Sequence, residues 1–206
     1  MTARPSKFIA FDLESGGLTP AHPDIQLAAV AIDEATWGEI DVFQRKIQFN
    51  IDQADPHALE INHYDPAVWE REAVTEHACV SEFRRFVDRH KSLDLWSQRT
   101  SKTYPAARLV GHNAATFDGP RLKAMFDRHG YFLPADLRVR CTVQRALWFF
   151  DEHPELARPR DMKLATLATY FGIPVAGAHD ALADVRLTIA LARALAGAAI
   201  NTEVRS

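Results

Sequence analysis

Three short segments of this chain carry acidic side chains whose types and spacing suit metal-ion chemistry. They read FDLES with Asp12 and Glu14, HNAATFD with Asp118, and AHDALAD with His179 and Asp184. Four carboxylates in one low-dielectric pocket repel one another by several kcal/mol unless cations neutralise them. Hard oxygen ligands of this kind suit Mg²⁺ or Mn²⁺. Two such ions about 3.5–4 Å apart would stabilise the attacking and leaving oxygens of a phosphoryl displacement, which predicts a metal-dependent nuclease.

The first segment ends an apolar run that predicts a buried strand. Asp12 and Glu14 are two residues apart, so a strand directs both side chains to one face. Burying an unpaired charge inside an apolar run is costly, which favours a functional role for both carboxylates. The structural alternative is an aspartate in a strand-end turn beside a solvated glutamate.

The second segment ends where a helix is predicted to begin. Asp118 precedes Gly119 and Pro120, and proline is favoured in the first turn of a helix. Taken alone, Asp118 is therefore predicted to be an N-cap. Together with the other two segments it is predicted to be a metal ligand. The two roles are compatible, because a helix N-terminus favours a carboxylate.

The third segment opens the last long helix. Asp180 is predicted to be the N-cap of this helix, which places Asp184 about one turn inside it as a metal ligand. His179 is expected on a loop, and the reference pKa of histidine, near 6.5, suits a general base at neutral pH. The structural alternative for His179 is an ordinary surface histidine.

Together these segments resemble the motifs of DEDDh-type 3′→5′ exonucleases in the ribonuclease-H-like superfamily. The similarity spans about residues 7–196 and keeps the order of the family's motifs. The matching stretches are Asp12 to Leu18 for Asp-x-Glu with its Gly-Leu turn, His112 to Asp118 for His-Asn-x-x-x-Phe-Asp, and His179 to Asp184 for His-x-x-x-x-Asp. No tyrosine lies between Asp180 and Asp184, which indicates the histidine subclass of the family.

The resemblance implies a role for each of the five motif residues. Asp12 would bridge two Mg²⁺ or Mn²⁺ ions, and Glu14 and Asp184 would complete the coordination of one of them. Asp118 would support the other ion, directly or through water. His179 would deprotonate the attacking water.

Contacts with the substrate are implied as well. The segment HALEINHYD is similar to the family's nucleotide-contacting segment, with His63 and Tyr64 in place of a Gly-Ile pair. Either side chain would stack on a base or pack as a surface aromatic residue. Phe117 is interpreted as a core side chain in preference to a stacking wedge. The predicted contact residues are Leu13, Ser15, Gly16, Leu59, Asn62, His63, His112, Asn113 and Phe117.

The hydrophobic pattern predicts alternating strands and helices after three early strands. Strands are expected over residues 7–13, 25–32, 40–49, 108–111 and 139–142, and helices over 75–90, 121–129, 146–150, 163–171 and 180–195. Residues 91–106 and 151–161 are predicted to be polar loops. This order predicts an α/β fold with a ribonuclease-H-like mixed sheet, in which three early antiparallel strands and two parallel strands are flanked by helices. The prediction is one domain over 1–206, with a core over about 7–196 and a tail over 197–206 that frays.

Composition agrees with a single globular domain. The chain has 206 residues, a hydrophobic fraction of 47%, a charged fraction of 25% and a net charge of −3. Four carboxylates that metal would neutralise account for this negative charge, and an enzyme that grips only a strand end needs no long basic stripe. Cys79 and Cys141 are far apart, which excludes zinc ribbons and predicts two small buried thiols. A cytoplasmic protein is expected, because the sequence shows no signal-peptide core and no apolar run of ~18 residues.

The predicted function is therefore metal-dependent 3′→5′ exonuclease activity on single-stranded DNA, releasing nucleoside 5′-monophosphates. The expected partner is the 3′ end of a single strand, with DNA favoured and RNA as an alternative, and no membrane. Two other hypotheses stay open: an exoribonuclease or oligoribonuclease-like enzyme, and a non-catalytic nucleic-acid-binding or polymerase-associated module. Basic residues predicted to approach phosphates are Arg138, Arg140, Arg158, Arg160 and Lys163.

Overall fold

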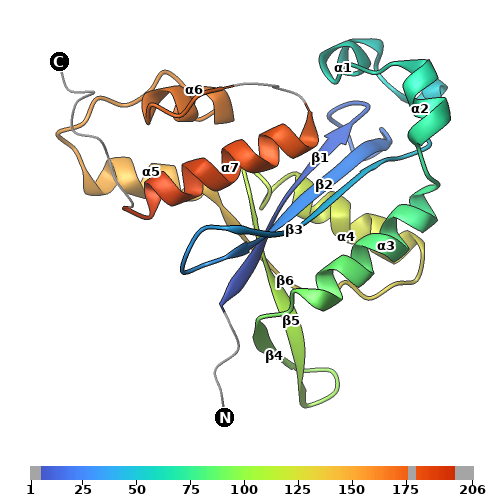
Figure 1. The fold of residues 1–206 in the computed structure, drawn as a ribbon, viewed down its shortest axis with the longest axis horizontal. Helices are drawn as coiled ribbons and strands as arrows, with labels where there is room; N and C mark the ends of the chain where they lie inside the picture. The colour runs from blue at the N-terminus through green and yellow to red at the C-terminus, as the bar shows by residue number, and fades with distance from the viewer. Residues whose placement is uncertain (1–5, 176–179, 198–206) are drawn as a thin grey trace.

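A single mixed sheet organises the chain, and its central strand carries the first acidic segment. The computed structural model describes residues 6–175 and 180–197 (Figure 1). Its strands are β1 (Lys7–Ser15), β2 (Asp24–Asp33), β3 (Glu39–Lys46), β4 (Leu93–Ser97), β5 (Lys102–Gly111) and β6 (Ala135–Cys141). The order is β3-β2-β1-β5-β4, with β6 also paired to β5. Strands β1 to β3 are antiparallel neighbours, whereas β5 is parallel to both β1 and β6.

Helices cover both faces of this sheet (Figure 1). The described helices are α1 (Pro56–Ile61), α2 (Pro66–Glu72), α3 (Glu76–Arg89), α4 (Asp118–Arg128), α5 (Thr142–Glu152), α6 (Leu164–Tyr170) and α7 (Ala181–Leu195). Alternate residues of β1 pack against the helices on opposite faces of the sheet. Ile9 and Phe11 join the core with α3 and α4, whereas Phe8 and Ala10 pack with α7. Both faces of β1 are therefore apolar until the strand reaches Asp12.

The predicted fold class is confirmed, since the sheet has three antiparallel strands followed by parallel strands between helices. Both cysteines are buried, as expected. His179 lies outside the described residues, which exclude 176–179. The expected tail also lies outside them except for Gly197, because 198–206 are not described. None of the helices in the described ranges combines the length and apolar character needed to cross a bilayer.

The prediction of a polar loop over residues 91–106 is wrong. This stretch forms β4 and the first half of β5, paired antiparallel from Leu93 with Ala106 to Ser97 with Lys102. Proline inside a strand removes a ladder donor and argues against a strand, and Pro105 lies in β5 opposite Asp94. The sheet tolerates it because, among the described strands, β5 pairs with β4 alone at this position, whereas the pairings of β5 with β1 and β6 begin only at Ala107.

Two short helices, α1 and α2, were not predicted at all. Each begins with an Asp-Pro pair, in which Asp55 or Asp65 accepts hydrogen bonds from the first-turn backbone and the proline occupies the first helical position. The helices have only 6 and 7 residues, too few for an apolar period to be visible. The repeated Asp-Pro signal was the feature that could have revealed them.

Candidate active site

The end of β1 supplies two of the acidic side chains. Asp12 pairs with Ala28 and Glu14 with Gln26 on the antiparallel neighbour β2. Both side chains follow Phe8 and Ala10 in alternation, so they lie on the face that α7 covers. Glu14 is buried, with 8% of its surface exposed, so its carboxylate is largely removed from solvent.

The N-terminus of α7 brings the third acidic side chain to the same place. Asp180 is the N-cap, and its Oδ1 accepts hydrogen bonds from the N–H groups of Leu182 and Ala183 at 3.2 and 3.1 Å. Its Oδ2 accepts from the side-chain amides of Gln26 and Gln44, both at 3.3 Å. The N-cap prediction for Asp180 is confirmed, and the two glutamines add a tie between α7 and strands β2 and β3.

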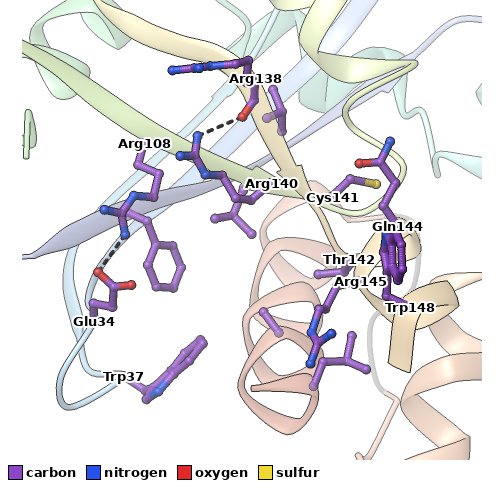
Figure 2. A pocket seen from close by; sticks show the side chains of 15 residues that line it. Glu34, Trp37, Arg108, Arg138, Arg140, Cys141, Thr142, Gln144, Arg145 and Trp148 are labelled. Carbon is purple, nitrogen blue, oxygen red and sulfur yellow. Dashed lines mark hydrogen bonds and ion pairs between the residues drawn. The ribbon is translucent and has the colours of Figure 1, made fainter. Parts of the chain in front are cut away.

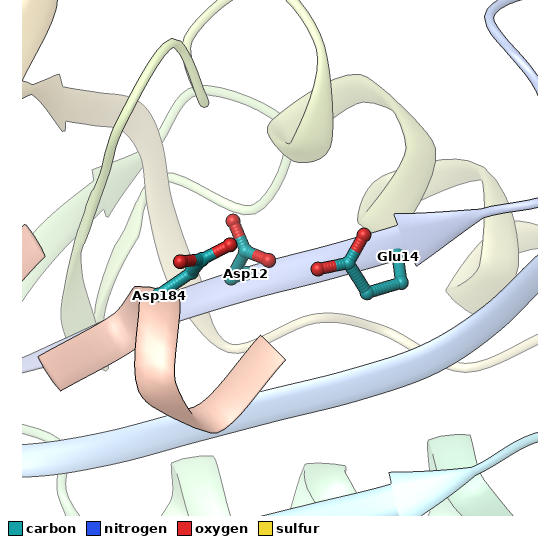
Figure 3. Close-up of side chains that lie close together, drawn as sticks. All are labelled: Asp12, Glu14 and Asp184. Atoms are coloured by element: carbon teal, nitrogen blue, oxygen red, sulfur yellow. The ribbon is translucent and has the colours of Figure 1, made fainter. Parts of the chain in front are cut away.

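Asp184 lies in the first turn of α7 and reaches toward β1 (Figure 3). One carboxylate oxygen from each of Asp12, Glu14 and Asp184 lies within 4.8 Å of the others. Oxygens that share one Mg²⁺ or Ca²⁺-sized ion at ~2.0–2.6 Å lie at most ~4–5 Å apart. Segments separated by about 170 residues in the sequence thus form a cluster of the size that a cation needs.

Asp118 is not part of this trio, and it is not the N-cap that its sequence context taken alone predicts. The N-cap of α4 is Phe117, without a side-chain hydrogen bond, and Asp118 is the first helical residue. A tight turn sets this register, because the N–H of Gly119 donates to the carbonyl of Ala114 at 2.7 Å. The Asp118 carboxylate is instead directed at β1, where it accepts from the N–H of Leu13 at 3.3 Å. The N-cap interpretation of Asp118 taken alone is wrong, whereas its role as a metal ligand stays a prediction.

Burial and mutual repulsion disfavour the charged form of these acids. Burial, followed by the charges of Asp118, Glu14 and Asp184, raises the pKa of Asp12 well above its usual range. Burial, followed by the charge of Asp184, raises the pKa of Glu14 to about 7. Burial likewise raises the pKa of Asp118 to about 7, against the hydrogen bond from Leu13.

No basic side chain in the described ranges forms an ion pair with Asp12 or Glu14. Arg121, which lowers the pKa of Asp118, is engaged elsewhere: its Nε donates to Asp24 at 2.6 Å, and its other nitrogens donate to the carbonyls of Thr19 and His22. The cluster is an all-oxygen donor set of three carboxylates. Such a set fits a hard divalent cation.

Several predicted contact residues bind the protein itself around the end of β1. The side-chain amide of Asn62 donates to the carbonyl of Ser15 at 2.9 Å, and the carbonyl of Gly16 accepts from the N–H of Asp55 at 2.7 Å. Leu59 is buried beside Trp69. These contacts hold α1 and α2 against the loop that follows Glu14. His63 is exposed next to them, with a positive φ of 51°.

The second segment supplies three further predicted contacts. His112 is held by both ring nitrogens, with Nδ1 2.8 Å from the hydroxyl of Thr142 and Nε2 2.9 Å from the carbonyl of Met162. Burial lowers the pKa of His112. Asn113 is exposed in a left-handed conformation with φ 56°. Phe117 is half-buried under the guanidinium of Arg121 at 5.2 Å, so its interpretation as a core residue is wrong.

The sequence analysis missed the residues that position the site. Arg121 and Asp24 form a buried ion pair that ties α4 to the loop between β1 and β2, and Gln26 and Gln44 anchor the cap of α7. None of the four lies in an acidic motif. The signals for the first pair were an arginine within the expected apolar face of α4 and an aspartate at the start of β2.

The mixed sheet and the three acidic segments define a DEDDh-type exonuclease of the ribonuclease-H-like superfamily. The family model RNase_T, described as Exonuclease, matches residues 9–192. The chain belongs to this exonuclease family. A comparison with curated proteins gives no significant match.

Solved structures of E. coli exonuclease I share the fold. The complex with a dT13 oligonucleotide has a TM-score of 0.70 and 22% identity over 92% of this chain and 41% of the other. The zinc-bound complex with single-stranded DNA has a TM-score of 0.70 and 24% identity, covering 91% and 40%. The chain therefore spans about two fifths of the exonuclease I chains that it matches.

Proposed function

We propose that this protein is a divalent-metal-dependent 3′→5′ exonuclease that shortens single-stranded DNA and releases nucleoside 5′-monophosphates. The observation that carries the proposal is the meeting of Asp12, Glu14 and Asp184 within 4.8 Å, with Asp118 hydrogen-bonded to the same end of β1. Membership of the exonuclease family supports phosphodiester hydrolysis at a strand end. The exonuclease I structures described as complexes with dT13 and single-stranded DNA support a DNA strand as substrate.

Asp12, Glu14 and Asp184 are the residues that would hold the cations, with Asp118 completing the set. Mg²⁺ or Mn²⁺ bound there would neutralise the carboxylates, lower the pKa of a water and stabilise charge on the departing oxygen. The acids do so as carboxylates, so the raised pKa values of Glu14 and Asp118 make cation binding compete with protons.

His179 serves as the general base, since it precedes Asp184 by five positions and its ring can take a proton near neutral pH. It accepts the proton of the water that attacks the terminal phosphorus. The bond from phosphorus to the 3′ oxygen of the preceding nucleotide breaks, and that oxygen takes up a proton. The products are a nucleoside 5′-monophosphate and a strand one nucleotide shorter with a new 3′ hydroxyl.

A cavity of 590 Å³ beside Asp184 gives the terminal nucleotide a place to bind. His112, Asn113 and Met162 line it, and Lys163 is the basic side chain among its lining residues. Because His112 bonds to both Thr142 and Met162, it fixes the wall of this cavity while Lys163 offers a charge to a phosphate. Asn113, exposed at the rim, is placed to hydrogen-bond a sugar or base.

The proposal is tested with single strands of DNA and RNA labelled at the 5′ end, incubated with Mg²⁺, Mn²⁺ or chelator. The expected result is a ladder of labelled DNA that shortens stepwise, only with metal, and faster than RNA. A 3′-phosphorylated strand should resist. Faster loss of RNA would assign an exoribonuclease, whereas cleavage of a closed circular strand would assign an endonuclease.

A further inference from the structure

A larger cavity, of 790 Å³, lies on the α7 side of the sheet, between β5, β6 and α5 (Figure 2). Its floor includes Phe8, which lies four residues before Asp12 on β1. Four residue steps along a strand cover about 13 Å. The cavity is thus separate from the carboxylate cluster but within the reach of one extended strand of a few nucleotides.

The charged residues that line this cavity are mostly basic. Arg108, Arg138, Arg140 and Arg145 line it with one carboxylate residue, Glu34, among the described lining residues, in a protein whose net charge is −3. Arg108 donates to Glu34 at 2.8 Å through Nη1, while its buried Nε has no hydrogen-bond partner among the described residues. A buried guanidinium N–H without a partner is rare and calls for an acceptor.

The other three arginines form ion pairs but keep their guanidinium groups at the surface. Arg138 and Arg140 share Asp136, and Arg145 contacts Glu152. The three arginine side chains are exposed, but Asp136 is buried, so only the pair of Arg145 and Glu152 joins two exposed groups and is weak for that reason. A phosphate can therefore displace Glu152 from Arg145 at little cost, and it can accept from the exposed guanidinium of Arg140 while Nη1 of that residue keeps its bond to Asp136.

Two tryptophans complete the cavity. Trp148 on α5 is 66% exposed, and Figure 2 shows it across the cavity from Arg108 and Arg140. Trp37 lies against Phe8, with ring centroids 5.5 Å apart. Helix α5 itself begins at the cavity without a side-chain cap, which leaves its first N–H groups available to an anion.

We infer that this cavity binds the single-stranded nucleic acid upstream of the 3′ end that occupies the carboxylate site. A base stacks on Trp148, and neighbouring phosphates contact Arg140, Arg145 and the start of α5. Cationic grooves with exposed aromatic rings bind single strands in this way without sequence preference. The inference rests on the proposed exonuclease function, because it assigns the cavity to the same strand.

The test measures binding in chelator, where the strand is not cut, by fluorescence anisotropy of a labelled dinucleotide and of a strand of about twelve nucleotides. Trp148→Ala should lower the affinity for the longer strand about tenfold and leave the affinity for the dinucleotide unchanged. For the longer strand, the logarithm of the binding constant falls linearly with the logarithm of the salt concentration. Arg140→Ala should make this slope shallower by about 0.7, the value of one phosphate contact with a single strand. With metal present, both variants should raise KM for the longer strand at unchanged kcat.

Matched controls are Trp96→Ala and Arg85→Ala. Trp96 is 63% exposed on β4, and Arg85 is an exposed residue of α3 on the other face of the sheet. Wild-type binding by Trp148→Ala and Arg140→Ala, or equal losses in the controls, overturns the inference. The inference is also overturned if an acidic aromatic peptide quenches the fluorescence of Trp148 while the nucleic-acid strand does not, because the cavity would then bind a peptide. If the wild type cuts no strand with metal, the proposed function fails independently of this cavity.

Discussion

The backbone N–H of Leu13 donates a hydrogen bond of 3.3 Å to the carboxylate of Asp118, across 105 positions of the chain. Leu13 lies between Asp12 and Glu14, so this bond fixes the second acidic segment against the first. Its side chain belongs to the core shared with α4, which holds the two elements together from the other face. One residue thus joins the packing of the sheet to the geometry of the acidic cluster.

The two functions of Asp118 can be separated by substitution. Asp118→Asn retains an oxygen that accepts from Leu13 and removes the charge, so the protein should stay folded and lose most of its nuclease activity. Asp118→Ala leaves the buried N–H of Leu13 unpaired and should also lower the free energy of unfolding by about 1–3 kcal/mol. Urea denaturation and an exonuclease assay measure the two effects. Equal unfolding midpoints for the two variants would contradict the role of this hydrogen bond.

The buried pair of Arg121 and Asp24 should matter more for stability than any exposed ion pair. Their side chains are only 8% and 4% exposed, and burial raises the pKa of Asp24 even with Arg121 beside it. Arg121→Met leaves the buried carboxylate with Arg128 at 3.5 Å as a poorer partner and should cost about 3 kcal/mol. Arg85→Ala on the exposed face of α3 is the control, expected to change stability by less than about 0.5 kcal/mol. Urea denaturation measures both, and a small loss for Arg121→Met would show that the pair is dispensable.

Without metal, the acidic cluster should make stability fall as the pH rises. Burial and the neighbouring carboxylates raise the pKa of Glu14 from 4.5 to about 7, so between these values the folded protein binds more protons than the unfolded chain. The free energy of unfolding then decreases with pH across that window, by on the order of 2–3 kcal/mol from this residue. Glu14→Gln should remove that part of the slope. Urea denaturation in chelator from about pH 5 to 8 measures it, and an identical slope in the variant would contradict the raised pKa.

The third segment should divide into a chemical and a structural residue. His179→Ala should lower kcat by ~10²–10⁴-fold with little change in metal affinity, because a general base acts in the chemical step. Asp180→Ala should keep the chemistry and cost ~0.5–2 kcal/mol for the lost cap, with a further loss from the bonds to Gln26 and Gln44. Single-turnover kinetics and thermal unfolding distinguish the two. An inactive but stably folded Asp180→Ala would overturn the assignment.

Local sequence rules were sufficient where one element decides a residue's place. The i, i+2 spacing in a strand predicted the shared face of Asp12 and Glu14, and the cap at Asp180 predicted the position of Asp184. These local rules failed where contacts between distant segments determine the position of a residue. The turn that places Asp118 one residue inside α4 depends on the hydrogen bond between Gly119 and Ala114, which no propensity encodes.

The same limit applies to stretches whose composition is misleading. Pro105 argues against a strand in the sequence, and only the assembled sheet shows that, among the described strands, β5 pairs with β4 alone at this position. Helices α1 and α2 are also stabilised by the burial of Leu59 and Trp69 against Ile25, a partner that lies more than 30 positions away. The buried pair of Arg121 and Asp24 likewise joins residues 97 positions apart.

The central claim is that the cluster of Asp12, Glu14 and Asp184 binds divalent cations, and calorimetric titration with Mn²⁺ tests it most directly. Wild-type protein at about pH 6, below the pKa of about 7 that Glu14 has without metal, should bind Mn²⁺ with release of protons, because carboxyl groups with raised pKa values must ionise. Asp12→Asn and Asp184→Asn should each abolish the tight binding, remove the rise in melting temperature that the metal produces and abolish nuclease activity. Mn²⁺ binding of unchanged affinity in a folded Asp12→Asn variant would contradict the account.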